Sequence, residues 1–410
     1  MPAKHRCTDV ASRVVLGLGG CIDYELKLSS STLQQLVAEH EIRDRELTLS
    51  VPVTDERSLI ISLLAHMKRG AGGEYFAASS EALRGFADRF PRRISLGGTS
   101  VRAALAMSRL GVPCTLHLVS VNDHVRRLLP ESCDYISSAH EDTLYPHIIV
   151  QYDQGTRVQV GDIDVRTPFP NRLIYVNDPA NASLVLSDQL GILLRDAGVF
   201  LISGFNTVRD QDVLDERLTT LRRHMQQLPP GAFVYYEDAA FHMPTFRRRV
   251  RNALLDVIDV YGLNEDEMQA DLGRSVDLLS VNEVEHALDS LKALIPAPTL
   301  VVHTKYWSLA LGETAGEYAD ALRDGIVIAS TRYSYGDDYS DEQYELTRGL
   351  QVRPAALSFA TALEERMGAV VRCVPGFTLE VSQPTTVGLG DSFVGGLLAS
   401  LVQRRTASWT

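Results

Sequence analysis

Short apolar runs alternate with helical stretches over most of the chain. The apolar runs predict buried strands at 14–18, 114–119, 199–202, 233–236, 257–260, 299–303 and 326–329. Helices are predicted at 100–110, 265–272, 283–294 and 354–367, and the first of these is rich in good helix formers. Strands that alternate with helices are typical of βα units. The pattern therefore predicts an α/β fold with a mainly parallel central sheet flanked by helices.

Residues 144–152 and 173–176 depart from this alternation. Both segments are strand-like, and the loop between them contains two glycines and two prolines. They predict an antiparallel excursion rather than a further βα unit. Together with the stretch that follows the first strand, they predict a smaller α/β domain. We expect a large domain made of 1–22, 91–143 and 178–410, and a smaller one made of 23–90 and 144–177.

Composition narrows the class of protein. The 410 residues carry a net charge of -12, with 45% hydrophobic and 22% charged residues, which is ordinary for a soluble globular chain. A nucleic-acid binder needs a basic face, so this class is excluded. The basic cluster Arg247, Arg248, Arg249 and Arg251 is interpreted as a solvated helix end.

The cysteines and the N-terminal segment predict a cytoplasmic protein. The five cysteines are odd in number and form no CxxC pair, so neither a disulfide framework nor a zinc site is expected. The apolar run at 14–18 is too short to span a membrane, and Asp23 and Glu25 follow it in place of a signal-peptide cleavage site. We expect a monomer that has no membrane partner.

A glycine turn near the C-terminus is the most informative segment. Gly388 and Gly390 precede an apolar helical stretch, and Asp391 follows them directly. Glycines let the backbone approach an anion, and the amides that begin a helix can bind one. An aspartate there can accept a proton from an attacking hydroxyl. The alternative is that Asp391 is the N-cap of the helix.

Several segments resemble one family. Residues 388–393 (GLGDSF) resemble the C-terminal signature of ribokinase-like kinases. Residues 261–267 (YGLNEDE), the pair His303 and Thr304, the NRLI run at 171–174 and the Gly-Gly turn at 97–98 resemble blocks of the ADP-dependent glucokinases and phosphofructokinases, in the family's order. Several weak motifs in one order are more specific than any one alone. The resemblance implies a ribokinase-like nucleotide-binding domain with a sugar-binding lid, and transfer of a phosphoryl group from ADP to glucose or a related sugar.

The resemblance also implies roles at the phosphate end of the site. Asp391 becomes the general base, and the amides of Gly388 and Gly390 stabilise the transferred group. Asn264 and Glu267, three residues apart, suit a Mg²⁺ ion, although an Asn N-cap with Glu at the third helical position is the alternative. The resemblance also implies Glu237 and Asp391 at the metal and Arg172 at the phosphates. The residues implied beside the nucleotide are Asn264, His303, Thr304, Val381 and Gly390.

The sugar site rests on residues from both expected domains. Asp23 follows the first strand, where ligands bind in open α/β folds. The resemblance adds Gly97, Gly98, Thr99 and His147, although a histidine in an apolar strand is also typical of a core. In this family an acidic residue at the place of Glu74 goes with glucose, and the alternative is a solvated glutamate on a glycine-rich loop. Arg102, beside the Gly-Gly turn, could instead hold a sugar phosphate, which keeps phosphofructokinase activity open.

The chain departs from the family pattern at several positions. Gly19, Gly20 and Cys21 stand where the family usually has asparagines before its sugar-binding aspartate, Thr99 replaces a glutamine, and Tyr235 replaces a histidine. These changes leave open the affinity for the sugar and its identity, and they motivate the alternative of a degenerate non-catalytic sugar- or nucleotide-binding protein. An ATP-dependent sugar or nucleoside kinase is a further alternative, because the choice of donor depends on the shape of the pocket.

Overall fold

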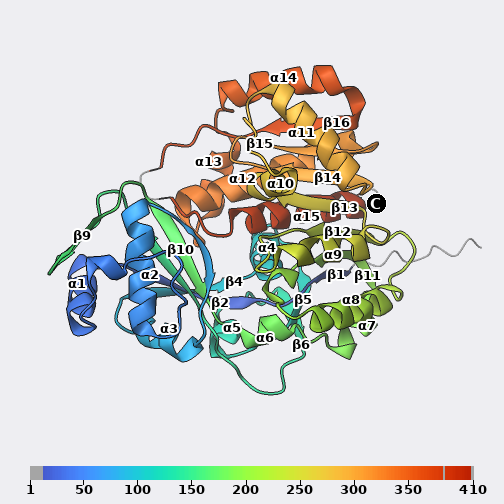
Figure 1. The fold of residues 1–410 in the computed structure, drawn as a ribbon. Coiled ribbons are helices and arrows are strands. Elements are labelled where there is room, and N and C mark those ends of the chain that lie inside the picture. The colour runs from blue at the N-terminus through green and yellow to red at the C-terminus, as the bar shows by residue number, and fades with distance from the viewer. Residues whose placement is uncertain (1–12, 382–383, 408–410) are drawn as a thin grey trace, which may run out of the picture.

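The computed structural model describes residues 13–381 and 384–407, and their strands form two separate main sheets (Figure 1). Cys7 lies outside the described residues. Within the described part of the chain, no helix is long and apolar enough to cross a membrane. The cytoplasmic location and the monomeric state stay predictions.

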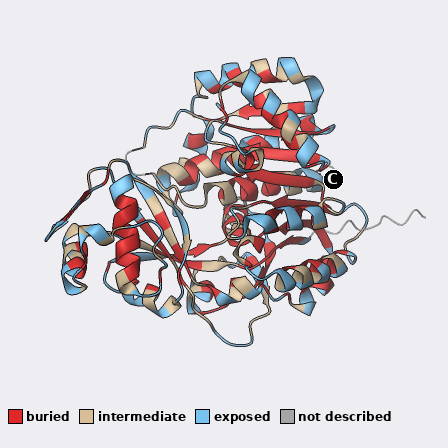
Figure 2. Ribbon diagram, in the orientation of Figure 1, coloured by how far each residue is buried: buried red, intermediate tan, exposed pale blue. Residues whose placement is uncertain are grey.

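The larger sheet is mainly parallel. Among the described residues it has nine strands, of which all but β15 run in one direction. In spatial order they are β16 (Val371–Pro375), β15 (Trp307–Leu311), β14 (Thr299–His303), β13 (Val260–Asn264), β12 (Phe233–Glu237), β11 (Ala197–Ile202), β1 (Arg13–Leu16), β5 (Cys114–Leu118) and β6 (Cys133–Ser137). Their nearly continuous burial is expected for strands covered on both faces (Figure 2). This confirms the predicted fold class.

Helices cover both faces of this sheet, so the sheet has a buried cluster on each face. Alternate residues of β1 belong to different clusters. Val14 and Leu16 belong to one buried cluster, and Val15 belongs to the other. The first cluster includes α4 (Thr99–Arg109), α12 (Ala319–Tyr335) and α15 (Leu389–Ala407). The second includes residues of α7 (Asp188–Leu194), α8 (Gln211–Met225), α9 (Pro244–Leu254), α10 (Glu265–Leu272), α11 (Val281–Leu294) and α14 (Pro354–Met367). Three further helices, α5 (Asp123–Leu128), α6 (Pro179–Ser183) and α13 (Asp341–Arg348), lie in the connections.

The smaller sheet has one apolar and one polar face. In the part of the chain that is described, its five strands are, in order, β3 (Gly73–Phe76), β10 (Asn171–Val176), β7 (His147–Tyr152), β2 (Cys21–Lys27) and β4 (Arg92–Gly97). Side chains alternate between the faces of a strand. Ile22, Tyr24 and Leu26 of β2 join the core with α1 (Ser30–Glu39), α2 (Glu56–Arg69) and α3 (Ser80–Ala87). Cys21, Asp23 and Glu25 therefore lie on the opposite, polar face.

The strand pairing extends this polar face across the sheet. Asp23 is paired with His147 of β7 and with Ser95 of β4. Farther along, Ile149 is paired with Ile174, and Ile174 with Glu74. Arg172, two residues before Ile174, shares its face. Residues far apart in the sequence are thereby placed on one surface.

Several predicted elements need correction. Residues 326–329 belong to helix α12 instead of a strand, because a short apolar run cannot by itself distinguish a strand from a buried helix. The strand expected at 257–260 is β13, which begins at Val260. Strands β7 and β10 are antiparallel as predicted, but the loop between them contains an unpredicted hairpin of β8 (Arg157–Val160) and β9 (Ile163–Arg166). Strand β4 pairs within the smaller sheet, whereas the expected large domain includes 91–143.

The fold predicts a specific pH dependence through His117. This side chain is fully buried on β5, and its Nε2 accepts a hydrogen bond of 2.9 Å from the backbone N–H of Ser187. Burial lowers the pKa of His117 from 6.5 to about 4. Between these values the unfolded chain binds a proton that the folded chain does not, so stability falls as the pH falls.

Between pH 7 and pH 4, we expect the unfolding free energy of the wild type to fall by about 3 kcal/mol more than that of the His117→Gln variant. Urea unfolding of both proteins across this range measures the difference. Parallel pH profiles for the two proteins would contradict the assignment.

Candidate active site

A cavity of about 740 Å³ brings together predicted residues from both sheets. It lies at the carboxyl ends of β12, β13 and β14, which carry Glu237, Asn264 and His303. Ligands of open α/β folds bind at such an edge. The predicted residues that line it are Glu74, Thr99, Arg172, Glu237, Asn264, Glu267, His303, Thr304, Gly388, Gly390 and Asp391. Five predicted residues are described but do not line this cavity, namely Asp23, Gly97, Gly98, His147 and Val381.

The glycine turn begins helix α15 and is tightly enclosed. Gly388 has φ 68°, a conformation that favours glycine, and a Cβ atom there would lie 2.3 Å from Cδ of Arg102. A Cβ atom on Gly390 would lie 2.8 Å from the ring of His303. Asp391 is in the first turn of α15, after Gly388 and Leu389, so it does not occupy the N-cap position. The geometry thus disfavours the capping interpretation of Asp391.

Arg102 connects the glycine turn to the smaller sheet. Its side chain is 3% exposed, its Nη2 donates to Oδ2 of Asp23 at 2.7 Å, and its Nε lies 3.9 Å from Oδ2 of Asp391. This buried guanidinium therefore lies between two carboxylates. Sequence reasoning offered Arg102 as a site for a sugar phosphate, but its charge is already balanced by Asp23 and Asp391.

Buried carboxylates at the strand ends are each compensated by a different group. Glu237 Oε1 contacts Nε2 of His303 at 2.8 Å. Asp238 accepts from Nε of Arg247 at 2.5 Å and from the hydroxyl of Tyr261 at 2.7 Å. Arg247 and Arg251 are buried, whereas Arg248 and Arg249 are exposed, so the prediction of a solvated basic cluster is wrong for the first two residues only. Sequence reasoning missed Asp238 and its partner, because the pairing joins β12 to a helix that follows it.

Asn264 and Glu267 form the capping box that was the alternative interpretation. The Oδ1 atom of Asn264 accepts from the backbone N–H groups of Asp266 and Glu267, and Glu267 Oε2 accepts from the N–H of Asn264 at 2.8 Å. Burial, with the nearby charges of Asp238 and Glu237, raises the pKa of Glu267 to about 8. The cap and a role at the phosphates are compatible, because both side chains also line the cavity.

The residues fit a hard divalent cation. Glu237 Oε2 is buried and has no hydrogen-bond partner among the described residues, and burial raises the pKa of this carboxyl although His303 opposes the shift. A Cβ atom on Gly262 would lie 2.1 Å from that oxygen, so glycine keeps the space open. Of the described residues, Glu237, Glu267 and Asp391 do not form a close three-ligand group. Mg²⁺, which usually keeps several waters, suits such separated carboxylates.

The polar face of the smaller sheet contacts the larger part of the molecule at several points. Arg172 Nη1 donates to the carbonyl oxygen of Thr386 at 3.2 Å. Glu74 Oε1 lies 3.0 Å from Nε2 of His242, and Arg93 of β4 is paired with Asp337. Sequence reasoning named Arg172 and Glu74 but missed their partners, because each contact joins segments that lie far apart in the sequence.

The fold and the cavity define an α/β protein in which a glycine turn and a set of buried carboxylates line one cavity. The model for the ADP-specific phosphofructokinase/glucokinase conserved region matches residues 12–399. The chain belongs to this family, which confirms the resemblance and the enzyme class that it implies, a phosphotransferase with an alcohol group as acceptor. ADP is the donor that the family name implies.

Individual relatives are distant. The chain is 25% identical over 126 residues to a probable ADP-dependent glucokinase of Caenorhabditis elegans, and the match spans 30% of this chain and 24% of that protein. Its fold is similar to that of a hypothetical ADP-dependent phosphofructokinase from Pyrococcus horikoshii OT3, with TM-score 0.78, 17% identity, and coverage of 97% of this chain and 100% of the other. A phosphofructokinase from the same organism, solved with AMP, gives TM-score 0.75, 16% identity and coverage of 97% and 99%.

The pair of Arg102 and Asp23 generates a prediction on stability. Arg102→Met leaves the carboxylate of Asp23 buried without its partner, which costs about 3–5 kcal/mol of unfolding free energy. Adding Asp23→Asn removes the uncompensated charge, so the double variant should recover much of this loss. Urea unfolding of the two single variants and the double variant measures the coupling. Simple additivity of the two effects would show that the pair does not interact.

Proposed function

We propose that this chain transfers the terminal phosphoryl group of ADP to a hydroxyl of glucose or a related uncharged sugar, and releases AMP. The observation that carries the proposal is the position of Asp391. It follows the glycine turn directly and lines a cavity that is also lined by Glu74 and Thr99, and by Asn264 and His303. A single cavity can thus bring an acceptor and a donor to the same carboxylate.

The proposed reaction follows from these groups. The carboxylate of Asp391 accepts the proton of the sugar hydroxyl while its oxygen attacks the terminal phosphorus of ADP, and the bond from that phosphorus to the bridging oxygen breaks. The amides of Gly388 and Gly390 stabilise the charge of the transferred group. Arg172, which reaches Thr386 beside the turn, adds positive charge there. We propose that Mg²⁺ is held, directly or through water, by Glu237, Glu267 and Asp391. When bound, this cation would neutralise phosphate charge.

The two substrates are assigned to different parts of the molecule. We propose that ADP lies along the strand ends of the large sheet, beside Asn264, His303 and Thr304. Val381 is kept as a proposed nucleotide contact from the resemblance alone. The sugar is proposed to lie against the polar face of the smaller sheet, with Asp23, Glu74, His147 and the turn Gly97, Gly98 and Thr99 as its contacts. The division into a large and a smaller domain remains part of this proposal, except that β4 pairs within the smaller sheet.

An uncharged sugar is favoured over a sugar phosphate. The guanidinium of Arg102 is committed to Asp23 and lies near Asp391, so it is not free to bind a phosphate. Glu74, which also contacts His242, lines the cavity with a carboxylate that would repel a phosphate group.

A substrate screen tests the proposed function. Purified protein with Mg²⁺ should phosphorylate glucose with ADP, form one AMP for each sugar phosphate, and work more slowly with ATP or with fructose 6-phosphate. Coupled detection of AMP and chromatography of the products measure both. Excess chelator should stop turnover. A preference for ATP would refute the donor assignment, and the absence of turnover with any sugar would favour a binding protein.

Asp391→Asn tests the general base. The amide has nearly the same shape but cannot accept the hydroxyl proton, so kcat should fall by about 10²–10⁴-fold. Nucleotide affinity should change little, because the glycine amides remain. Steady-state kinetics and thermal unfolding measure the two effects. Thr386→Ser, at a position that contacts Arg172 through its backbone carbonyl, is a matched control that should keep most of the activity. An unchanged kcat in Asp391→Asn would place the base elsewhere.

A further inference from the structure

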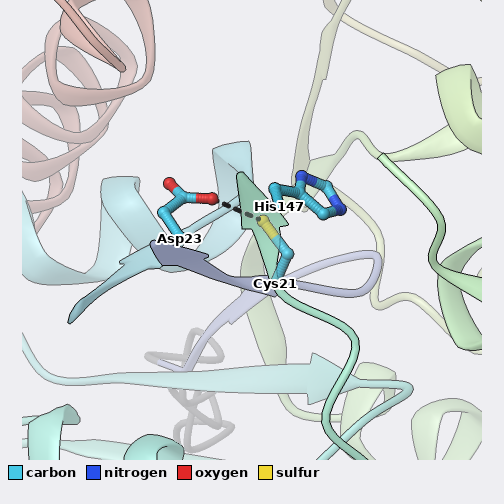
Figure 3. Close-up of side chains that lie close together, drawn as sticks. All are labelled: Cys21, Asp23 and His147. Carbon is cyan, nitrogen blue, oxygen red and sulfur yellow. Dashed lines mark hydrogen bonds between the residues drawn. The ribbon is translucent and has the colours of Figure 1, made fainter. Parts of the chain in front are cut away.

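Three side chains with metal-ligand chemistry gather on the polar face of the smaller sheet. They are Cys21 and Asp23 of β2 and His147 of β7 (Figure 3). Each offers one ligand atom, and these atoms all lie within 4.8 Å of one another. Within the described ranges, no other group of three such side chains is as close. The thiol of Cys21 lies 3.4 Å from Oδ1 of Asp23.

The architecture of the sheet creates this cluster. Cys21 and Asp23 are two residues apart on β2, so they share a face, and Asp23 is paired with His147 on the neighbouring strand. Gly97 of β4 is paired with Cys21. A Cβ atom on Gly97 would lie 2.4 Å from Oδ2 of Asp23 and 2.6 Å from Sγ of Cys21. Glycine at this position therefore leaves room for the carboxylate and the thiol.

Groups behind the cluster orient its members as outer partners of metal ligands do. Arg102 binds Oδ2 of Asp23, and Oδ1 remains directed toward Cys21. His147 Nε2 is buried and makes no hydrogen bond to any described residue, although Oδ2 of Asp178 lies 3.4 Å away. A carboxylate behind a metal-binding histidine is a usual feature of metal sites.

The donor set and its spacing select the kind of ion. Tetrahedral zinc with a sulfur ligand at ~2.3 Å and an oxygen ligand at ~2.0 Å holds these two atoms about 3.5 Å apart. The separation in this protein is 3.4 Å. A thiolate and an imidazole suit Zn²⁺ and similar ions, whereas Mg²⁺ takes oxygen ligands. This cluster therefore differs in chemistry from the carboxylates proposed for Mg²⁺.

We propose that Cys21, Asp23 and His147 bind one thiophilic divalent cation of the Zn²⁺ class, with Asp178 as the outer partner of the histidine. Three protein ligands leave a fourth position open for water or another oxygen donor. The site shares Asp23 and His147 with the proposed sugar contacts. It is therefore tested without sugar or nucleotide, and its outcome does not depend on kinase activity.

The test is direct metal binding to the full chain after treatment with a chelator. Titration with Zn²⁺ in a calorimeter should give one site per chain. Co²⁺ as a spectroscopic probe should give the visible bands of a tetrahedral site and a thiolate-to-cobalt charge-transfer band. Cys21→Ala should abolish the charge-transfer band and the Zn²⁺ site. Cys373→Ala, which removes a thiol on β16 of the other sheet, is the matched control and should keep both.

A second variant tests the role of the outer carboxylate. Asp178→Asn should weaken Zn²⁺ binding by about 10–100-fold and leave the thiolate band of the Co²⁺ protein in place. Circular dichroism verifies that each variant is folded. Equal Zn²⁺ affinity in the wild type and in folded Cys21→Ala, or a Co²⁺ spectrum without a thiolate band in the wild type, would overturn the proposal.

Discussion

The buried guanidinium of Arg102 is the contact on which the arrangement of the site depends. It extends from helix α4 to Asp23 in the smaller sheet, and it lies under the glycine turn, 3.9 Å from Asp391. A buried arginine is costly unless carboxylates compensate it. The two aspartates and the arginine therefore constrain one another, and the close contact requires glycine at position 388. This one side chain therefore fixes the positions of the smaller sheet, the glycine turn and the proposed base relative to one another.

The polar face of the smaller sheet explains how residues from distant parts of the sequence meet. Alternation along each strand buries one set of side chains against α1, α2 and α3 and presents the other set to the large unit. Asp23, Glu74 and Arg172 each reach a different partner there. The same alternation brings Cys21 next to Asp23 and His147 (Figure 3). One rule of strand geometry thus produces both the proposed sugar surface and the proposed metal site.

The carboxyl ends of the strands of the large sheet form a buried acidic environment. Glu237, Asp238 and Glu267 are buried close together, and each has its own compensating group, which is a histidine, an arginine or a backbone amide. Burial still raises the pKa values of all three carboxyls. A site that concentrates incompletely compensated negative charge favours cations, which agrees with the Mg²⁺ expected for phosphoryl transfer.

The sequence by itself determined the features that depend on local chemistry. The alternation of apolar runs and helices indicated the α/β class, the glycines before Asp391 indicated the turn, and Asn264 with Glu267 indicated a cap, since each signal acts within a few residues. The tertiary structure decided the rest. The apolar run at 326–329 is part of the long helix α12, and Arg102 binds Asp23 because the pairing of β2 with β4 brings Asp23 close to the helix that follows β4. Such partners are separated by tens of residues or more, and only the folded chain brings their charges together.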